Sequence, residues 1–539
     1  MNVIATHTHR MLFFSLVVPL ITFLAFGMYG FCDTDQGFIQ ALSWRVVNGQ
    51  IPFRDFISVR PPLSIYLHAL PMLIFPAQWV VLVERAIFYL MISLSVFWMT
   101  RSLERYFDFK EIGLSPEAFA FIAFICSVHN FPPMPWHTVD GIFFASWGVN
   151  LICRKTSAAG LLGGIALLTC AALCKQAFYP MIPAGLFLMW FLREKKPALW
   201  ATFIWLAVLA AGMVIVYIRY PELPGLFWEQ TTGATTLEDL FSVGIIRYAK
   251  PFVLIVLPLL IIWRAHGLYD RAYLPVLLYG LVFFGLLGLH VYHTLVFHAY
   301  TGPSYGFSQA FFLIAAGVSV KGFWVNPRAF ALLLVLLLVS WCTGISWGYA
   351  NNMLCFTPVI FGLIYWIYEE FNFTVPRYFY GIIAVILIWI FAILNEYPYR
   401  DAPRESMKKT IGDVFPRMSG IYTGDGFHNK AEELKKMTES RDGLFTVLPA
   451  WPLAHYVTET MSPFPADWAH NAEVNYNALA SDLQSRLNQD VDFVLIEKDK
   501  INEARNSGPY GSLITGYVLD HWTPCEHGAF FDVYCPPTR

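Results

Sequence analysis

Apolar stretches long enough to cross a membrane recur along most of this chain, and they constrain its fold more than any other feature. A hydrocarbon core about 30 Å thick needs roughly 20 apolar residues in a helix. The clearest such stretches are Met11–Gly30, Val80–Met99, Ala198–Ile218, Ala272–Leu289, Ala329–Thr343, Met353–Tyr368 and Gly381–Leu394. Only 14% of the 539 residues are charged, whereas soluble domains carry about 25%. Residues 1–394 are therefore predicted to form an α-helical polytopic membrane domain.

The first apolar stretch, Met11–Gly30, has the position of a signal peptide. It lacks an Ala-x-Ala-like cleavage site, and the chain continues directly into further apolar segments. We therefore expect it to be retained as a signal anchor.

Basic residues between the apolar stretches predict the orientation, because cytoplasmic loops are enriched in Lys and Arg. Basic loops occur at Arg154-Lys155, Arg193–Lys196, Arg264 with Arg271, and Lys321 with Arg328. Placing them in the cytoplasm puts loops 32–60 and 220–250 on the outer face. About 14 apolar stretches would return the C-terminus to the cytoplasm, so one of them is expected not to cross. The short stretches Pro61–Phe75 and Phe119–Val128 are the candidates, which leaves about 13 transmembrane helices.

The first outer loop, residues 32–60, is too polar to span a membrane. Its polar residues Gln36, Gln40 and Arg45 alternate with apolar residues at roughly helical spacing. This pattern predicts an amphipathic helix that lies on the outer membrane surface, and Pro221–Ala249 is predicted to form a second one.

Residues 395–539 have the composition of a soluble α/β domain, which the predicted topology makes periplasmic or extracellular. Helices are predicted at Asn429–Glu439 and Val474–Asn488, strands at Gly443–Leu448 and Val491–Ile496, and a strand pair within Tyr517–Tyr534. This domain has too few recognisable motifs to carry catalysis by itself.

Two of the nine cysteines, Cys525 and Cys535, lie in this C-terminal region, with a turn-like His527-Gly528 between them. In an oxidising compartment such a pair forms a disulfide. The alternative is two ordinary thiols.

Acidic residues at the membrane boundary are the clearest candidates for catalysis. Asp33 and Asp35 follow the first apolar stretch, and Asp140 opens a later one on the same face. A carboxylate beside hydrocarbon usually has a partner, a ligand or a function. Transfer of a sugar from a phosphate carrier needs a base for the acceptor proton. Alternatively, Asp33 or Asp35 only caps the helix that begins near Gln36.

Three short motifs lie at the predicted outer ends of apolar stretches. The first comprises Asp35-Gln36-Gly37, Ala41, Arg45, Asn48-Gly49-Gln50-Ile51-Pro52-Phe53-Arg54-Asp55-Phe56 and Arg60-Pro61-Pro62-Leu63. The second is Trp136-His137-Thr138-Val139-Asp140-Gly141, and the third is the pair Lys175-Gln176. Together they resemble motifs of the GT-C superfamily, which includes the protein O-mannosyltransferases and the lipid A aminoarabinose transferase. The first two motifs are similar to the first and second outer loops of that superfamily, and the layout of most of the chain is similar as well.

This resemblance implies an outward-facing active site and inversion at the sugar carbon. It makes Asp35 the candidate base, with Asp33 as its rival because this chain has two aspartates here. It implies that Asp140 orients the acceptor or the base. The residues that it implies for the substrate and its phosphate are Arg54, Asp55, Arg60, His137, Lys175 and Gln176. Gln36 departs from the usual pattern, in which a second acid often follows the catalytic aspartate.

Other polar residues in apolar surroundings have simpler interpretations. Glu84-Arg85 is predicted to form an intramembrane ion pair. Tyr300 and Tyr305 are candidates for lining a sugar or carrier pocket. The spacing of His290, His293 and His298 does not fit a zinc-binding helix, so no metal and no other cofactor is expected.

The sequence therefore predicts a bacterial inner-membrane glycosyltransferase. Its expected partners are membrane lipids, a polyprenyl-phosphate-linked sugar (hexosyl or pentosyl) and an acceptor in the cell envelope. No nucleotide fingerprint or basic block points to a nucleotide sugar or nucleic acid. The alternatives are a lipid or glycan transporter, which usually has internal repeats, and a non-catalytic assembly protein.

Overall fold

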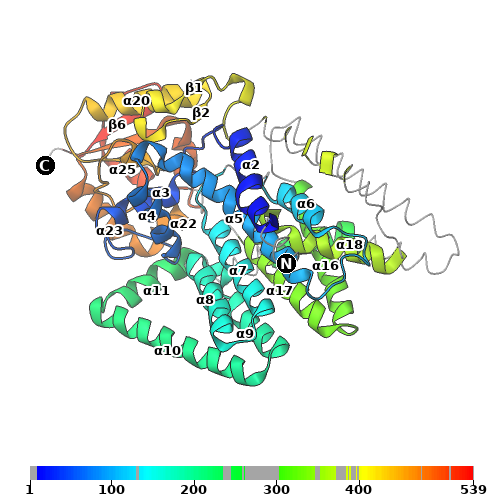
Figure 1. The fold of residues 1–539 in the computed structure, drawn as a ribbon. Helices are drawn as coiled ribbons and strands as arrows, with labels where there is room; N and C mark the ends of the chain where they lie inside the picture. Colours follow the sequence, from blue (N-terminus) through cyan, green and yellow to red (C-terminus); the bar gives the residue numbers. More distant parts are fainter. Residues whose placement is uncertain are drawn as a thin grey trace.

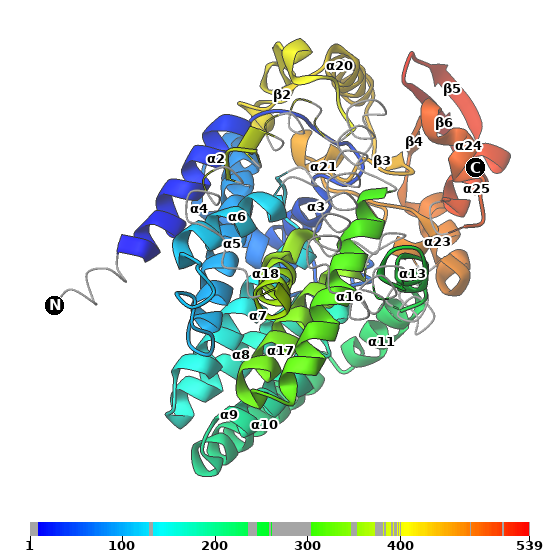
Figure 2. The same ribbon diagram turned by 90° about the vertical axis from the view of Figure 1, so that its right-hand side faces the viewer.

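The structure is a computed structural model. It describes residues 9–128, 133–234, 245–257, 260, 303–345, 353–371, scattered positions between 381 and 400, and residues 401–474, 476–508 and 511–537. These residues are mostly helical, and a small sheet lies near the C-terminus (Figure 1). A view turned by 90° places the C-terminal strands and α20 (Asp425–Glu439) at one end of the molecule and the apolar helices at the other (Figure 2).

Four described helices are long and apolar enough to cross a membrane, so the chain is a membrane protein by length and composition of its helices. They are His9–Phe26, which includes α2 (Val18–Phe26), Ala77–Leu103, which includes α5 (Val80–Leu103), α10 (Lys195–Arg219) and α17 (Pro327–Gly344). The other long helices are α4 (Leu63–Ile74), α6 (Pro116–Val128), α7 (His137–Arg154), α8 (Ala158–Cys174), α9 (Met181–Leu192), α11 (Leu223–Ala234), α16 (Pro303–Phe323) and α18 (Thr357–Phe371). The count of 13 crossings stays a prediction, because the apolar stretch Ala272–Leu289 lies outside the described residues.

The two segments suspected of not crossing are both short helices. The 12 residues of α4 reach about 18 Å at 1.5 Å per residue, which is less than a 30 Å hydrocarbon core. Pro71 lies inside α4, and α6 has 13 residues. Which of them fails to cross stays a prediction.

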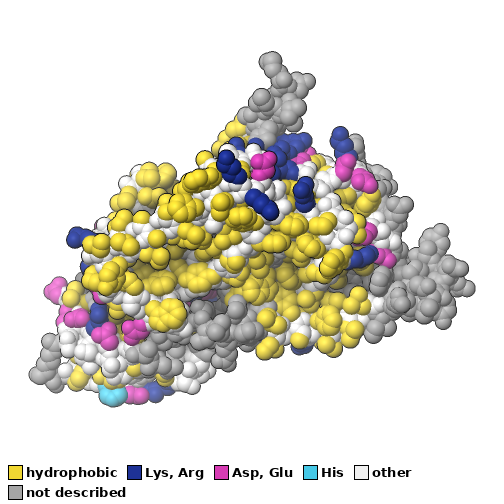
Figure 3. Space-filling model, turned by 90° about the horizontal axis from the view of Figure 1, so that it is seen from below, with side chains coloured by type: hydrophobic (Ala, Val, Ile, Leu, Met, Phe, Trp, Pro, Cys, Tyr) yellow, Lys and Arg dark blue, Asp and Glu magenta, His cyan; other side chains and the backbone are white. Residues whose placement is uncertain are grey.

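Hydrophobic side chains cover most of the face that is seen from below Figure 1, the side on which α10 lies (Figure 3). Only 11% of the apolar window of α10 is buried inside the protein. Surfaces of this kind are suited to contact with lipid.

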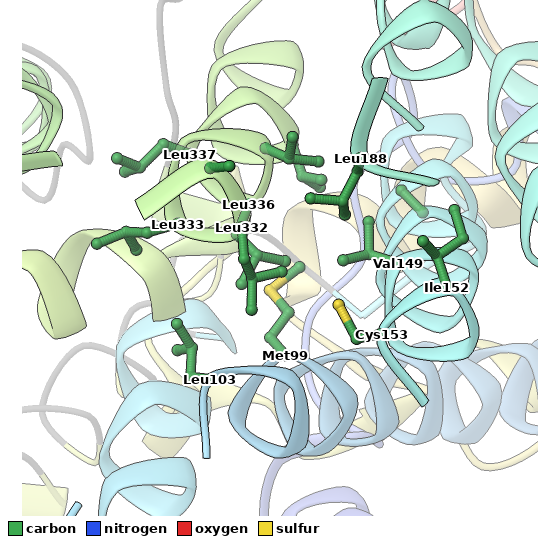
Figure 4. Packing of buried hydrophobic residues seen from close by; sticks show 14 of the residues in the cluster. Met99, Leu103, Val149, Ile152, Cys153, Leu188, Leu332, Leu333, Leu336 and Leu337 are labelled. Atoms are coloured by element: carbon green, nitrogen blue, oxygen red, sulfur yellow. The ribbon is translucent and has the colours of Figure 1, made fainter. Parts of the chain in front are cut away.

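The interior of the helical region is packed by aliphatic, aromatic and sulfur-containing side chains, among them residues of α5, α7, α9 and α17. In Figure 4, Met99 and Leu103 of α5 lie close to Leu332 and Leu336 of α17. Helices α7 and α8 approach closely at Gly148 and Gly164. A Cβ added at Gly148 would lie 2.8 Å from the Gly164 carbonyl oxygen, so a larger residue would not fit there. Small residues at such crossings permit tight helix packing in membranes.

The C-terminal region contains a four-stranded mixed sheet in the order β3-β4-β6-β5. Strand β3 (Phe445–Leu448) is parallel to β4 (Phe493–Glu497), and β6 (Phe531–Cys535) is antiparallel to both β4 and β5 (Thr523–His527). Short strands β1 (Lys409–Thr410) and β2 (Tyr422–Thr423) form a second pair, and the longer helices are α20, α23 (Tyr476–Asp490) and α25 (Leu513–His521). These elements agree with the predicted helices and with the first two predicted strands.

The prediction of a strand pair over Tyr517–Tyr534 was wrong at its start, because residues 517–521 continue α25. The pair itself is formed by β5 and β6. A disulfide joins Cys525 of β5 to Cys535 of β6, with 6.0 Å between their Cα atoms. The boundary predicted at 394–395 stays a prediction, since most residues around it lie outside the described ranges.

The helix predicted in the first outer loop is present as α3 (Phe38–Val47), and its polar side chains are largely buried inside the protein. Gln40 and Arg45 are buried because the C-terminal region covers this helix. Arg45 donates hydrogen bonds of 2.5 and 2.9 Å to the carboxylate of Asp467. Gly37, which precedes α3 with φ +92°, has the side chain of Leu453 where a Cβ would lie, so this contact requires glycine.

Candidate active site

Two cations from distant parts of the sequence approach each other where the first outer loop ends. Arg60 precedes α4, and Lys175 follows α8. Lys175 is buried, and its Nζ donates a 3.1 Å hydrogen bond to Thr138 Oγ1 in the first turn of α7. The neighbouring Gln176 donates a 2.6 Å hydrogen bond to the carbonyl oxygen of Val59. The motifs that contain these residues therefore form one continuous group.

This group holds more positive than negative charge. Burial and the nearby guanidinium of Arg60 lower the pKa of Lys175 from 10.5 to about 7, while Glu473 acts in the opposite direction. His137, at the start of α7, is buried, and its Nε2 has no hydrogen-bond partner among the described residues. Glu473 is the carboxylate paired with Arg60. Two cations with one paired carboxylate and an unsatisfied ring nitrogen form a site that is suited to an anion such as a phosphate.

The C-terminal region contributes directly to this group through Glu473. Arg60 Nη1 donates a 2.5 Å hydrogen bond to Glu473 Oε2, and Arg60 Nη2 donates to the second carboxylate oxygen. The guanidinium also lies over the ring of Phe38, 5.2 Å from its centroid. Trp468, from the same C-terminal segment, lies 4.7 Å from the Phe38 ring between centroids. Aromatic side chains therefore pack against the guanidinium of Arg60.

Asp140 belongs to a second, acidic group behind the cations. His68 of α4 stands between two carboxylates, with its Nε2 at 3.1 and 3.2 Å from the Asp140 oxygens. Its Nδ1 lies 2.5 Å from Glu84 Oε2 of α5. All three side chains are at most 3% exposed. Asp140 is therefore held by a histidine and does not cap a helix with its side chain.

The predicted ion pair between Glu84 and Arg85 was wrong. Consecutive residues of a helix point in different directions, so the two side chains have different partners. Arg85 donates to the carbonyl oxygens of Gly27 and Gly30 at 2.9 and 2.6 Å and to Gln36 Oε1 at 2.8 Å. Arg85 thus holds the backbone segment that follows the first apolar helix, residues 27–36, in place.

Asp33 lies in an ion cluster with the C-terminal region. Its oxygens lie 2.5 Å from Lys430 Nζ and 3.4 Å from Lys500 Nζ, and both lysines also contact Glu497. Burial alone would raise the pKa of Asp33, but the ammonium groups of Lys500 and Lys430 lower it below its usual value of 3.8. A carboxylate held in this way is a weak proton acceptor, so its contacts favour a structural role.

Asp35 is the more accessible of the two aspartates. Its side chain is 25% exposed, and its Oδ2 lies 3.4 Å from Nη1 of Arg400. The thiol of Cys32 donates to the same oxygen at 3.7 Å. Within the described part of the chain, no hydrogen bond or ion pair joins Asp35 to Asp140. Their predicted convergence on one cavity stays a prediction.

Arg54 and Asp55 form a pair with each other. Arg54 Nε and Nη2 donate to the Asp55 carboxylate at 2.8 and 2.9 Å, and Asp55 also accepts a 2.7 Å hydrogen bond from the backbone of Ile51. The Arg54 side chain is 39% exposed and lies over the ring of Tyr220. These contacts place the pair near the start of α11. None of these contacts of Arg54 and Asp55 involves Arg60 or Lys175.

Some candidates cannot be located. Tyr300 and the histidines 290, 293 and 298 lie outside the described residues, and Tyr305 is in α16 but its side chain also lies outside them. Among the residues that the structure does describe, no group of three or more His, Cys, Asp or Glu side chains is arranged to hold a metal ion.

The sequence reading missed His68 and Glu473. A histidine in an apolar helix is a usable signal, because polar residues in membrane segments usually have a partner. His68 follows Arg60 by eight residues and could have been noted on this basis. Glu473 gave no comparable signal, since it is one of many charged residues in a soluble region.

No protein-family model and no curated protein sequence matches this chain. Among solved structures, the archaeal oligosaccharyltransferase AglB from Archaeoglobus fulgidus, in complex with an inhibitory peptide and a dolichol-phosphate, is 13% identical over 91% of this chain and 69% of its own, with a TM-score of 0.45. The oligosaccharyltransferase of that organism tethered to an acceptor peptide is 12% identical over 100% and 74%, with a TM-score of 0.48. ArnT from Cupriavidus metallidurans bound to undecaprenyl phosphate is 12% identical over 98% of both chains, with a TM-score of 0.45. The likeness concerns the fold.

Proposed function

We propose that this chain is an inverting glycosyltransferase that moves a sugar, hexosyl or pentosyl, from a polyprenyl-phosphate carrier to an acceptor in the cell envelope. The observation that carries the proposal is the approach of Arg60 to the buried Lys175 at the end of the first outer loop, where Glu473 pairs with Arg60. Arg60 and Lys175 lie at the ends of apolar helices, and this position suits a ligand with a phosphate headgroup and a lipid tail. The acceptor is a lipid, a glycan or a protein.

In this reaction the acceptor hydroxyl attacks the sugar carbon on the face opposite the phosphate. The bond between that carbon and the phosphate oxygen breaks, and its electron pair leaves with the phosphate. A base takes the hydroxyl proton as the new carbon–oxygen bond forms. Arg60 and Lys175 stabilise the charge that develops on the leaving phosphate. No metal or other cofactor takes part in these steps.

Asp35 is proposed as the base, since Asp33 is occupied by two lysines and Asp35 is partly exposed. Asp140 is proposed to orient the acceptor hydroxyl. The site is proposed to open on the outer face of a bacterial inner membrane, with residues 395–539 forming a periplasmic domain above it. The disulfide of that region supports this orientation, because disulfides persist in oxidising compartments.

The experiment is binding of undecaprenyl phosphate to the purified protein in detergent, measured by native mass spectrometry or fluorescence quenching. Lys175→Met should weaken binding by about 10-fold to 100-fold, since a hydrogen bond to a charged group contributes about 1.5–3 kcal/mol. Lys409→Met is the matched control, because Lys409 is 44% exposed and its ion pair among the described residues is with the exposed Asp425. Equal affinity of Lys175→Met and wild type would contradict the proposal.

A further inference from the structure

A chain of hydrogen bonds links Glu84, His68 and Asp140, and the mechanism above uses only the last of them. The three side chains come from α5, α4 and α7, and each of these helices meets the others at this point. Burying two carboxylates and a histidine together is costly unless the hydrogen bonds compensate for lost hydration.

The geometry of this hydrogen-bonded group sets the number of protons that it carries. An ionised carboxylate only accepts hydrogen bonds, and a ring nitrogen donates only when it carries a proton. Both nitrogens of His68 face carboxylates, so each of the two bonds needs one proton. The group therefore carries two bonding protons and a net charge of minus one. The proton between His68 and Glu84 can reside on either partner without changing the bond to Asp140.

The alternative arrangement would place a proton on Asp140, and two observations disfavour it. Asp140 lies in the first turn of α7, where the partial positive charge of an 18-residue helix stabilises an ionised carboxylate. Glu84 has the opposite environment, since its Oε1 is buried without a hydrogen-bond partner among the described residues. An unsatisfied buried oxygen is less costly on a neutral carboxyl group than on an ionised one.

We infer that His68 is a positioning residue that orients the Asp140 carboxylate through its Nε2 proton, and that Glu84 fixes the histidine in this state. This inference rests on the proposed function, in which Asp140 orients the acceptor hydroxyl. The neighbouring groups that titrate or carry charge are Cys174 beside Asp140, His137 beside His68, and Tyr456 near Glu84. Neither the thiol nor the phenol supplies a cation that could replace His68.

Two substitutions at His68 separate this role from packing. The amide nitrogen of glutamine reaches about as far as Nε2, whereas that of asparagine reaches about as far as Nδ1. His68→Gln should retain the donor to Asp140 and keep kcat within about threefold, while His68→Asn should lower kcat about 30-fold or more with little change in donor KM. Both replacements leave a void, so equal losses, or a larger loss in His68→Gln, would refute the inference.

A spectroscopic measurement tests the same point without transferase activity. Selective 15N-histidine labelling of the full chain in nanodiscs, assigned with His68→Gln, reports which ring nitrogen is protonated. Nε2 of His68 should carry a proton throughout pH 6–8, both with and without the polyprenyl-phosphate-linked sugar. A His68 signal with Nε2 unprotonated would overturn the inference and leave the proposed function standing. Conversely, a protonated Nε2 in a protein that transfers no sugar would refute the function alone.

Discussion

Glu473 of the C-terminal region holds the guanidinium of Arg60 by two hydrogen bonds, one of 2.5 Å between Nη1 and Oε2 and one from Nη2 to Oε1. The Glu473 side chain is 1% exposed and that of Arg60 is 17% exposed. A carboxylate bound to arginine by two parallel bonds occupies the positions that two phosphate oxygens would take. A phosphate that binds Arg60 must therefore compete with Glu473.

Glu473→Gln should strengthen binding of undecaprenyl phosphate by about 10-fold, which corresponds to about 1.4 kcal/mol. The neutral amide competes less well for the guanidinium, and the net positive charge of the site rises by one. Binding would be compared with that of Glu432→Gln, whose side chain is 58% exposed on α20. Weaker binding in Glu473→Gln would show that Glu473 orients Arg60 for the ligand instead of competing with it.

The parts of the fold that could be predicted depend on local patterns. The strands Gly443–Leu448 and Val491–Ile496 were visible as short apolar runs, and they match β3 and β4 closely. The spacing of polar and apolar residues predicted the helix of the first outer loop, but it did not predict which residues bury the polar side chains of that helix. Burial of Gln40 and Arg45 depends on Asp467 and its neighbours, more than 400 residues further along the chain.

The candidate site shows the same division. Lys175 and Arg60 were predicted from motifs, and their contacts in the structure lie in one group. The partner of Asp140 could not be predicted, because any histidine or cation of several apolar helices could have filled that position. The apolar stretch around His68 is also short, as the 12 residues of α4 show, and its length indicates a non-crossing segment without pointing to site residues.

The ion cluster of Asp33, Lys430, Lys500 and Glu497 should make the stability depend on pH. Burial raises the pKa of Glu497 from 4.5 to about 6, although Lys500 opposes it. A carboxyl group whose pKa is higher in the folded state stabilises the fold below about pH 4.5, and this contribution is lost as the pH rises to about 6. Asp33 acts in the opposite direction, because its lowered pKa gives stability that is lost as the pH falls below 3.8.

We therefore expect the stability of the wild type, relative to that of Glu497→Gln, to decrease by about 1.5 kcal/mol from pH 4.5 to 6.5. The apparent melting temperature in detergent, followed by tryptophan fluorescence, would measure it. The wild type should lose several degrees relative to the variant over this interval. Parallel curves for the two proteins would contradict the assigned effect of Glu497.

The disulfide between Cys525 and Cys535 should both stabilise the C-terminal region and report its compartment. Closing a loop with a sequence separation of 10 residues contributes about 2–3 kcal/mol in the chain-entropy model. The double variant Cys525→Ser/Cys535→Ser should therefore unfold at a lower temperature. In cells, a thiol reagent applied after acid quenching and denaturation should label two more cysteines in wild type once reductant is added. The double variant should show no such difference, and equal labelling of the wild type with and without reductant would contradict a periplasmic location.

The base is tested by two neighbouring substitutions that preserve shape. Asp35→Asn keeps most hydrogen bonding but removes the proton acceptor, so transfer should fall by about 10²-fold or more while expression stays nearly normal. Asp33→Asn should act differently, because Asp33 bridges Lys430 and Lys500. We expect it to lower the melting temperature and to cost less transfer than Asp35→Asn. The measurement is transfer of radiolabelled sugar from polyprenyl-phosphate donors into envelope fractions, with melting curves of both variants as the control for folding. The reverse ranking would move the base to Asp33, and near-normal transfer in both single variants and in the double variant would eliminate this mechanism.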